Sequence, residues 1–206
     1  MLALLMAGGK GERLGPVGVE KPLLEFAGKP LVAHVVAALI KSQIVRVVMV
    51  TSPHTPCTTH WARNSCVPLL VAPGQGYIHD YRWAMKRLGL NDPVLIISAD
   101  LPMINHQLID KIIEHYARVE SPALGVYLPS KFFDEADMSP DLVLRAGAKL
   151  LVPSGINIVD ASLPDQTQQE TMLVINDESL LYNINKKSDL RRLNRTVGES
   201  GLTKQG

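Results

Sequence analysis

A glycine-rich loop with several cations follows the first apolar run of the sequence. Leu2–Met6 has the aliphatic composition of a buried strand. The loop after it includes the glycines Gly8, Gly9, Gly11 and Gly15 and the cations Lys10, Arg13 and Lys21. Glycines allow backbone N–H groups to converge on an anion without obstruction by a Cβ atom, and the cations add positive charge around it. The combination predicts a binding loop for a polyphosphate.

The loop differs from two common nucleotide-binding motifs. It contains no Gly-Lys pair followed by Ser or Thr, so it is not a P-loop. Leu14 stands where the dinucleotide-binding fingerprint requires its third glycine. Lys21 precedes Pro22, which favours an extended backbone at the lysine. Because Arg13 shares the loop, we interpret Lys21 as a phosphate-binding residue rather than a solvated surface lysine.

Asp100 is the candidate metal ligand. It follows Pro93–Ala99, an apolar run that predicts a buried strand, so its carboxylate is expected at the rim of a rigid sheet. Mg²⁺ is commonly held by one or two carboxylates together with substrate phosphates and waters. The alternative is a helix N-cap, but Asn105 is better placed to cap the helix that follows. The sequence therefore predicts a magnesium ligand at Asp100.

The composition limits the class of protein. The chain has 206 residues, 46% of them hydrophobic and 20% charged, which suffices for one full core. Lys and Arg number 21 against 20 acidic residues, and this balance argues against a general nucleic-acid-binding protein. Cys57 and Cys66 form neither a metal-ligand pattern nor a disulfide framework, and no apolar stretch of about 18 residues occurs. We expect a cytoplasmic protein without a membrane span.

Apolar runs alternate with helical patterns along most of the chain. The expected strands are Leu2–Met6, Val45–Thr51, Val67–Ala72 and Pro93–Ala99, and the expected helices are Pro30–Ser42, Tyr77–Leu88 and Asn105–Arg118. Short strands are expected at Ala123–Leu128, Leu142–Leu144, Lys149–Val152 and Gly155–Val159, then a helix at Ser188–Leu193. This order predicts an α/β fold: a Rossmann-like, mostly parallel central sheet with helices on both faces and a small antiparallel β extension in the C-terminal half. We expect one domain over residues 1–196 and a flexible tail over 197–206.

Polar or glycine-rich segments follow the predicted parallel strands. They are the loop from Gly8 to Lys21, Thr51-Ser52-Pro53, Gly74-Gln75-Gly76 and Asp100-Leu101-Pro102. Ligands of open α/β sheets bind outside the carboxyl ends of the strands, so these segments are expected to converge on one site.

The first motif resembles the signature of a known enzyme family. L-x-M-A-G-G-x-G-x-R-x-G (Leu4 to Gly15), followed by Lys21-Pro22, is similar to that of the nucleotidyltransferases related to the molybdenum-cofactor guanylyltransferase and the sugar-phosphate uridylyl- and cytidylyltransferases. Asp100-Leu101-Pro102 resembles the magnesium-binding segment of that family. Asn183-Ile184-Asn185 with Asp189-Leu190 resembles its C-terminal motif, whose asparagine joins the metal shell in some members.

Three further segments narrow the resemblance. T-S-P-H-T-P (51–56), G-Q-G-Y-I-H-D (74–80) and L-V-P-S-G-I-N-I-V (151–159) are similar to the stand-alone adenosylcobinamide-phosphate guanylyltransferases of cobalamin biosynthesis. This resemblance implies GTP as donor, adenosylcobinamide phosphate as acceptor, adenosylcobinamide-GDP and pyrophosphate as products, and Mg²⁺ as cofactor.

The resemblance also implies residue roles. The nucleotide would be bound by Leu5, Ala7, Gly8, Gly9, Lys10, Gly11, Arg13, Lys21, Thr51, Ser52, Pro53, Gly76 and Asp100. Arg13, Lys21 and Asp100 would be catalytic, Asp100 and Asn185 would hold the metal, and Ser154, Gly155 and Asn157 would contact the acceptor. Pro16-Val17 and Gly18-Val19-Glu20 lengthen the loop relative to the family pattern, which bears on the reach of Lys21.

Other functions stay open from the sequence. The acceptor could instead be the molybdenum cofactor or a sugar phosphate. A nucleotide-sugar glycosyltransferase shares the sheet architecture but usually carries a D-x-D motif, whereas Asp100 is followed by Leu101. A non-catalytic GTP-binding module is disfavoured because Arg13, Lys21 and Asp100 occur together. An apolar edge strand in the second half could pair across a homodimer.

Overall fold

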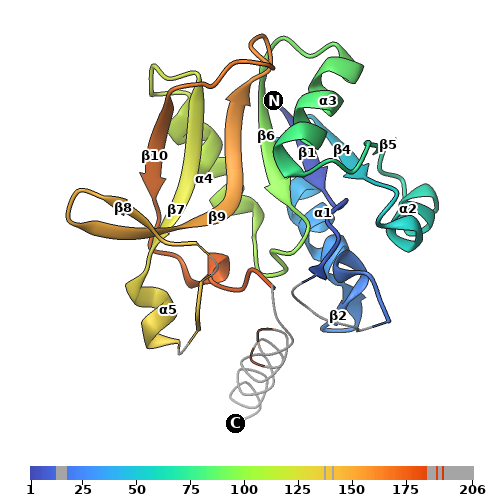
Figure 1. Ribbon diagram of the computed structural model, residues 1–206, viewed down its shortest axis with the longest axis horizontal. Coiled ribbons are helices and arrows are strands. Elements are labelled where there is room, and N and C mark those ends of the chain that lie inside the picture. The colour runs from blue at the N-terminus through green and yellow to red at the C-terminus, as the bar shows by residue number, and fades with distance from the viewer. Residues whose placement is uncertain (13–17, 137, 141, 185–188, 190–191, 193–206) are drawn as a thin grey trace.

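A central mixed sheet runs through the computed structural model, which describes residues 1–12, 18–136, 138–140, 142–184, 189 and 192. The strand order is β10-β7-β9-β6-β1-β4-β5, and β8 pairs with the first residues of β9 (Figure 1). These strands are β1 (Leu2–Met6), β4 (Arg46–Thr51), β5 (Leu69–Val71), β6 (Pro93–Ser98), β7 (Ala123–Pro129), β8 (Leu144–Ala146), β9 (Lys149–Asp160) and β10 (Glu170–Val174). β2 (Glu25–Phe26) and β3 (Lys29–Pro30) form a separate two-stranded sheet.

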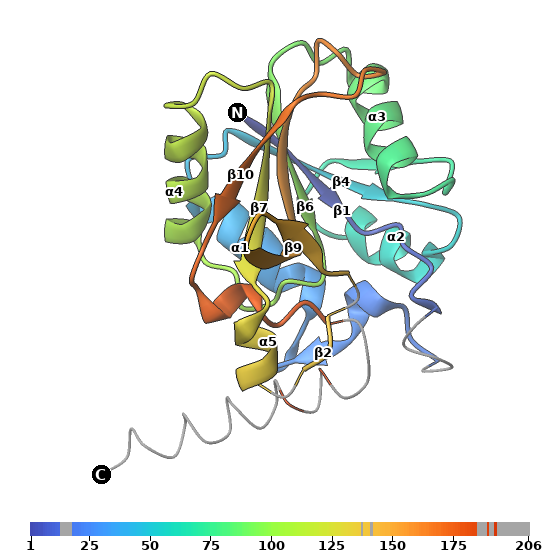
Figure 2. The same cartoon turned by 60° about the vertical axis from the view of Figure 1, so that its left-hand side comes forward.

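Helices cover both faces of the sheet. They are α1 (Leu31–Lys41), α2 (Pro56–Arg63), α3 (Tyr77–Leu88), α4 (His106–Tyr116) and α5 (Lys131–Glu135), with short 3₁₀ helices η2 (Lys21–Leu23) and η3 (Glu178–Leu180). α1 and α4 lie behind the sheet in the view of Figure 1, whereas α3 lies in front of it; Figure 2 shows α3 and α4 on opposite sides. The predicted α/β fold with a mostly parallel sheet and helices on both faces is therefore confirmed.

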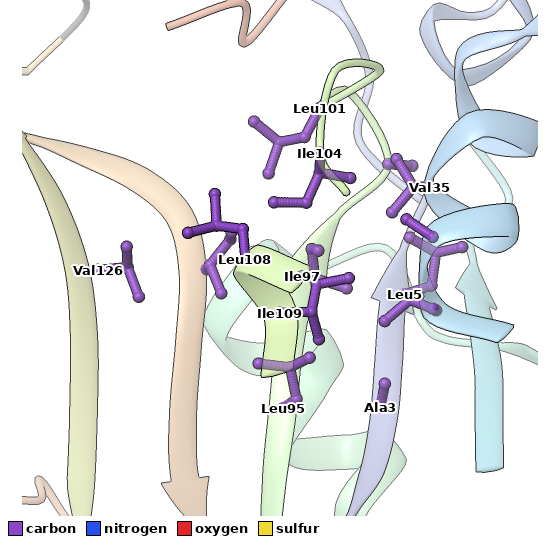
Figure 3. Packing of buried hydrophobic residues seen from close by; sticks show 14 of the residues in the cluster. Ala3, Leu5, Val35, Leu95, Ile97, Leu101, Ile104, Leu108, Ile109 and Val126 are labelled. Atoms are coloured by element: carbon purple, nitrogen blue, oxygen red, sulfur yellow. The ribbon is translucent and has the colours of Figure 1, made fainter. Parts of the chain in front are cut away.

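The sheet separates two apolar cores. Along β1, Ala3 and Leu5 belong to the larger cluster, and Leu4 and Met6 to the cluster under α3. This is the alternation expected of a strand buried on both faces. In the larger cluster Leu95 and Ile97 of β6 face α4, where they pack near Leu108 and Ile109 (Figure 3).

Helix ends follow the expected residue types. The Asn105 side chain accepts a 2.9 Å hydrogen bond from the Leu108 amide, so the predicted N-cap of α4 is confirmed. Gly89 ends α3 with φ 63°, the left-handed conformation in which glycine avoids the penalty of a Cβ atom.

The C-terminal half differs in detail from the sequence prediction. β9 is one strand of 12 residues, where two short strands were predicted, and it runs antiparallel between β6 and β7. The break was predicted at Pro153-Ser154, but the strand continues through both residues and through Gly155, whose φ is 83°. β10 was not predicted, because its residues are exposed or only partly buried. Of the predicted helix Ser188–Leu193, only Asp189 and Arg192 are described, both helical, and residues 197–206 lie outside the described part.

Truncation at Ile97 tests the packing of β6 against α4. Ile97 is 0% exposed. We expect Ile97→Val to lower the free energy of unfolding by about 0.5–1.5 kcal/mol and Ile97→Ala by about 2–5 kcal/mol, because the second leaves a larger cavity. Urea unfolding measures both. Ile40→Ala, at a position 66% exposed on α1, is the control and should change the free energy of unfolding by less than about 0.5 kcal/mol. Equal losses at both positions would contradict this assignment of the core.

Candidate active site

Gly8 lies against the residues that end β4. A Cβ atom at position 8 would stand 3.0 Å from Ser52 Cβ and 3.0 Å from the Thr51 carbonyl carbon, so only glycine fits without displacement. The Ser52 hydroxyl donates a 2.6 Å hydrogen bond to the Gly8 carbonyl. The Ala7 amide donates to the Val50 carbonyl at 2.8 Å, which extends the pairing of β1 with β4. The glycine-rich loop therefore starts from a fixed position.

The polar residues Thr51 and Ser52, at the end of β4, are buried rather than open to solvent. Thr51 is 0% and Ser52 is 1% exposed. The Thr59 hydroxyl donates to Thr51 Oγ1 at 2.8 Å, and Ser52 Oγ accepts from the His54 amide at 3.1 Å. Pro53 is exposed, and neither it nor the two buried residues line the cleft. The contacts of Thr51 and Ser52 within the protein stabilise the backbone of one wall of the cleft.

A cleft of about 630 Å³ opens at the carboxyl ends of β1 and β6, within the usual size range of small-molecule sites. Most of the residues predicted for the nucleotide line it, namely Ala7, Gly8, Gly9, Lys10, Gly11, Lys21, Gly76 and Asp100. The rest of the lining is Met6, Glu12, Pro22, His54, Gly74, Gln75, Tyr77, Asp80, Ser98 and Ala99. Leu5 is fully buried in the larger core instead. Arg13 and Asn185 lie outside the described residues.

Asp100 is fixed at the end of β6 and contacts Lys21. The Ala99 amide donates to the Met6 carbonyl at 3.0 Å, so the pairing of β6 with β1 continues to the residue before Asp100. The Lys21 ammonium contacts Asp100 Oδ2, and the two side chains are only 16% and 11% exposed. Two predicted catalytic residues, 79 positions apart in sequence, thus form an ion pair in the cleft.

Asn183 is a neighbour of Asp100 that the sequence analysis did not select. With its amide nitrogen turned towards the carboxylate, Asn183 donates to Asp100 Oδ1 at 3.3 Å and to Oδ2 at 3.0 Å. The Ile184 amide donates to the Asp100 carbonyl at 3.2 Å, which holds this segment at the end of β6. Asn183-Ile184-Asn185 carries the resemblance, but the sequence alone does not show which of its two asparagines faces Asp100.

The donor set at Asp100 fits a magnesium ion that also binds phosphate. Turning the Asn183 amide by 180° points its oxygen at the Asp100 carboxylate, and a cation between them would meet hard oxygen ligands from both. Among the described residues no group of three or more His, Cys, Asp and Glu side chains could form an all-protein cage. A site with few protein ligands is typical of Mg²⁺ that enters with a nucleotide.

Asp80 holds the turn between β5 and α3. It is 5% exposed and accepts hydrogen bonds from the Gly74 amide at 3.0 Å and the Gln75 amide at 3.1 Å. Gly76, with φ 117°, then leads into the helix. Asp80 belongs to the segment 74–80 that carries the resemblance, but no role was predicted for it. The available signal was an acidic residue in the first turn of a helix that follows a glycine turn.

Tyr77 stands between the cleft and β9. Although 40% of its surface is exposed, the protein around its phenol raises the pKa of that group, with burial as the largest cause. The Asn157 side chain acts to lower the pKa, and the negative charge of Asp100 acts to raise it. The phenol is therefore neutral over the working pH range and within electrostatic reach of both residues.

Glu20 attaches the segment before Lys21 to α2. Its carboxylate accepts from the Cys57 amide at 2.7 Å, from the Thr58 amide at 2.6 Å and from the Thr58 hydroxyl at 2.6 Å. These bonds satisfy N–H groups at the start of a helix, where a negative charge is also favourable. Lys21 is thus positioned by the residue next to it, a role that the sequence analysis missed because the partners are 37 and 38 positions away.

The predicted acceptor residues differ in accessibility. Ser154 is 1% exposed, and its hydroxyl accepts from the Ile156 amide at 3.2 Å, so it faces the protein interior. Gly155 lies beside β6, since a Cβ atom there would be 3.3 Å from Ser98 Cβ and 3.6 Å from the Asn183 side chain. Asn157 is partly exposed. None of the three lines the cleft itself.

Comparison with known proteins identifies the family. Residues 3–202 match the family of MobA-like NTP transferase domains. The chain belongs to this family. It is accordingly a nucleotidyltransferase, an enzyme that moves a nucleotidyl group from a nucleoside triphosphate to an acceptor.

Two relatives of this protein align with nearly its whole chain. The nucleotidyltransferase is 32% identical to an adenosylcobinamide-phosphate guanylyltransferase from Methanocaldococcus jannaschii, over 98% of this chain and 100% of that protein. It is 26% identical to a Thermococcus sibiricus protein described as a molybdenum cofactor guanylyltransferase, over 94% and 97% of the two chains.

Solved structures agree on the fold. A Bacillus anthracis protein described as a glucose-1-phosphate thymidylyltransferase superposes with a TM-score of 0.70 at 14% identity, with 95% of each chain covered. A CMP:2-keto-3-deoxy-manno-octonic acid synthetase gives 0.68 at 13% identity, over 97% and 98% of the chains. Among the described helices, none combines the length and apolar composition needed to cross a bilayer.

Alkylation of Cys57 tests the position of Glu20. Glu20 raises the pKa of the exposed Cys57 thiol, mainly through its negative charge and then through a hydrogen bond. Glu20→Gln removes the charge, so the pKa should fall, the thiolate fraction at pH 8 should rise, and iodoacetamide should react faster with Cys57. Mass spectrometry of the Cys57 peptide measures the rate, and the exposed Cys66 is the internal control. An unchanged or slower reaction at Cys57 would contradict the contact.

Proposed function

We propose that this nucleotidyltransferase transfers GMP from GTP to the phosphate of adenosylcobinamide phosphate, and releases adenosylcobinamide-GDP and pyrophosphate. The observation that carries the proposal is the cleft in which the glycine-rich loop meets the Lys21–Asp100 pair. The donor and acceptor are taken from the similarity to the Methanocaldococcus enzyme. We also propose that residues 1–196 form the nucleotidyltransferase domain.

The glycine-rich loop would bind the β- and γ-phosphates. Gly8, Gly9 and Gly11 line the cleft, and Gly11 has φ 65°, so backbone amides can turn towards an anion there. The Lys10 side chain is 57% exposed beside the cleft and can swing onto a bound phosphate. Arg13 would add a second cation, a role that only the resemblance to the family supports. These groups would stabilise the leaving pyrophosphate, whose charge increases as its bond to the α-phosphorus breaks.

Lys21 would act on the α-phosphate. Its ammonium is already in the cleft and its main-chain position is fixed by the contacts of Glu20. When the nucleotide binds, the Lys21 ammonium would exchange the Asp100 carboxylate for an oxygen of the α-phosphate. A positive charge held over the α-phosphate stabilises the charge that develops in the transition state.

Asp100 would hold Mg²⁺ with the help of Asn183, while Asn185 is a further candidate on the resemblance. Bound there, the ion would neutralise phosphate charge and fix the triphosphate geometry. The acceptor phosphate oxygen would attack the α-phosphorus in line, the new P–O bond would form, and the bond to the β-phosphate would break. Little proton transfer is needed, so catalysis depends on positioning and charge neutralisation.

The guanine would lie between the turn at Gly74–Gly76 and the start of the glycine-rich loop. His54 Nε2 is 3.1 Å from the Gly74 carbonyl and lines the cleft, so the imidazole and the turn form one wall. Thr51 and Ser52 would act indirectly, because their hydroxyls are engaged within the protein. Backbone groups of Gly76 would read the edge of the base.

Pyrophosphate release tests the proposal. The purified protein with GTP and Mg²⁺ should release pyrophosphate only when adenosylcobinamide phosphate is present. A thermal-shift series with GTP, ATP, CTP and UTP should give stabilisation by GTP. Turnover with the molybdenum cofactor, the activity named for the Thermococcus relative, or with a sugar phosphate would replace the proposed acceptor. GTP binding without turnover on any acceptor would indicate a non-catalytic module.

Asp100→Asn tests the metal ligand. The variant keeps the shape of the side chain at the rim of the cleft, so the far-ultraviolet circular dichroism spectrum and the fold should be retained. Turnover should fall about a thousandfold, because a neutral amide is a poor ligand for Mg²⁺. Asp92→Asn, at an exposed position before β6, is the matched control and should keep full activity. Normal pyrophosphate release by Asp100→Asn would remove Asp100 from the mechanism.

A further inference from the structure

The nucleotide cleft leaves one side of Asp100 for the acceptor. In the described part of the chain, all residues that line the cleft lie between positions 6 and 100, and none comes from β7, β9 or β10. Under the proposed function, the acceptor phosphate attacks on the side opposite the leaving pyrophosphate. The acceptor therefore approaches across β9, where Gly155 lies beside Ser98 and Asn183.

None of the described helices covers the front face of the sheet in this direction. The core under α3 includes residues of β1, β4 and β6 and touches β9 at Val159, and none of its described residues belongs to β7 or β10. In Figure 1 none of the described helices lies in front of β7, β9 or β10, whereas α4 is behind β7 and β9. Leu124, Val126 and Leu128 of β7 face the core on the α4 side, so Gly125 and Tyr127 face the front.

Tyr127 and Glu170 form a polar pair on this face. The Tyr127 hydroxyl donates to Glu170 Oε1 at 2.5 Å. Both side chains lie over Gly125, since a Cβ atom there would be 2.5 Å from Glu170 Oε1 and 2.7 Å from Tyr127 Cε2. Tyr127 is 7% exposed, and burial, the Glu170 hydrogen bond and the Glu170 charge all raise the pKa of its phenol. Tyr127 is thus a constant donor that holds the carboxylate in place.

Glu170 keeps acceptor capacity for a ligand. The residue is exposed, and in the described part of the chain no lysine, arginine or histidine forms an ion pair with it. The Tyr127 hydroxyl is the only described donor to the carboxylate, which leaves Oε2 for an outside partner. A carboxylate at this position repels phosphate and selects N–H donors. Met172, 43% exposed on the same strand, offers an adjacent apolar contact.

The sheet register gives the distance between the Glu170 carboxylate and Asp100, and therefore the length of a ligand that contacts both. Ile96 of β6, Asn157 of β9 and Gly125 of β7 lie in one row across the sheet. The Glu170 carboxylate over Gly125 is two strand spacings from β6, and Asp100 is four residues beyond Ile96. With 4.8 Å between strands and 3.3 Å per residue, the separation is on the order of 15 Å. A single sugar phosphate is too short to span it.

We propose that the front face of β9, β7 and β10, which no described helix covers, binds the body of a large acceptor rich in carboxamide groups, and that the exposed Glu170, held by Tyr127 over Gly125, accepts hydrogen bonds from those amides. Cobinamide has both properties, a macrocycle of this size with carboxamide side chains. The inference rests on the proposed function and adds to it the residues that select the acceptor.

Two variants test Glu170 through the acceptor KM. Glu170→Gln keeps the size and the acceptor oxygen for Tyr127 but removes the charge, and it should raise the KM for adenosylcobinamide phosphate about tenfold. Tyr127→Phe keeps the ring over Gly125 and should raise that KM about threefold, because the carboxylate loses its support. The GTP KM and kcat should stay within about twofold in both. Glu114→Gln on α4, behind the sheet, is the matched control and should leave all constants unchanged.

The outcomes separate this inference from the proposed function. If the wild-type protein does not use adenosylcobinamide phosphate at all, the proposed function fails first. If it does, and Glu170→Gln and Tyr127→Phe keep the wild-type acceptor KM, the inference is overturned while the function stands. Sedimentation of the same variants measures their oligomeric state, and so tests whether a second copy of the chain occupies this face instead. A shift from dimer to monomer with an unchanged acceptor KM would assign the face to a subunit interface and overturn the proposal.

Discussion

β1 pairs in parallel with β4 on one side and with β6 on the other, from Leu2 to Met6. The pairing sets Met6 beside Val50 and Ser98, so the loops that follow the three strands open at the same edge of the sheet. The Ser52–Gly8 hydrogen bond and the Lys21–Asp100 contact both require this register. A slip of one residue would also exchange the two faces of a strand that is buried on both sides. The core therefore fixes the geometry of the cleft.

The segment that contains the glycine-rich loop is held at both described ends. Gly8 is fixed by packing against the end of β4, and Glu20 is fixed by three hydrogen bonds to the start of α2. Lys21 follows directly, with Asp100 as its partner. Positioning of this kind reduces the reorganisation needed when a triphosphate binds, and positioning is the main contribution a protein makes to this type of transfer.

The parallel half of the fold could be predicted from sequence because its signals are local. Buried strands such as Pro93–Ser98 read as uninterrupted apolar runs, and Tyr77–Leu88 has helical spacing. The convergence of the segments after these strands follows from topology. The contacts of Asp80, Glu20 and Asn183 could not be predicted in the same way. Each depends on a backbone turn or on a partner distant in sequence, and a polar residue type does not reveal which backbone amide it will reach.

The acceptor half is harder to predict for a physical reason. The rule that ligands bind outside the carboxyl ends of strands applies to β1, β4 and β6, but β9 runs antiparallel to β6 and β7. The acceptor residues proposed on it lie in the middle of the strand, where side chains alternate between the two faces. That alternation places Ser154 in the interior while Asn157 stays partly exposed. Ligand residues on such a strand are specified by register, and register is fixed by pairing with β6 and β7 rather than by any motif within β9.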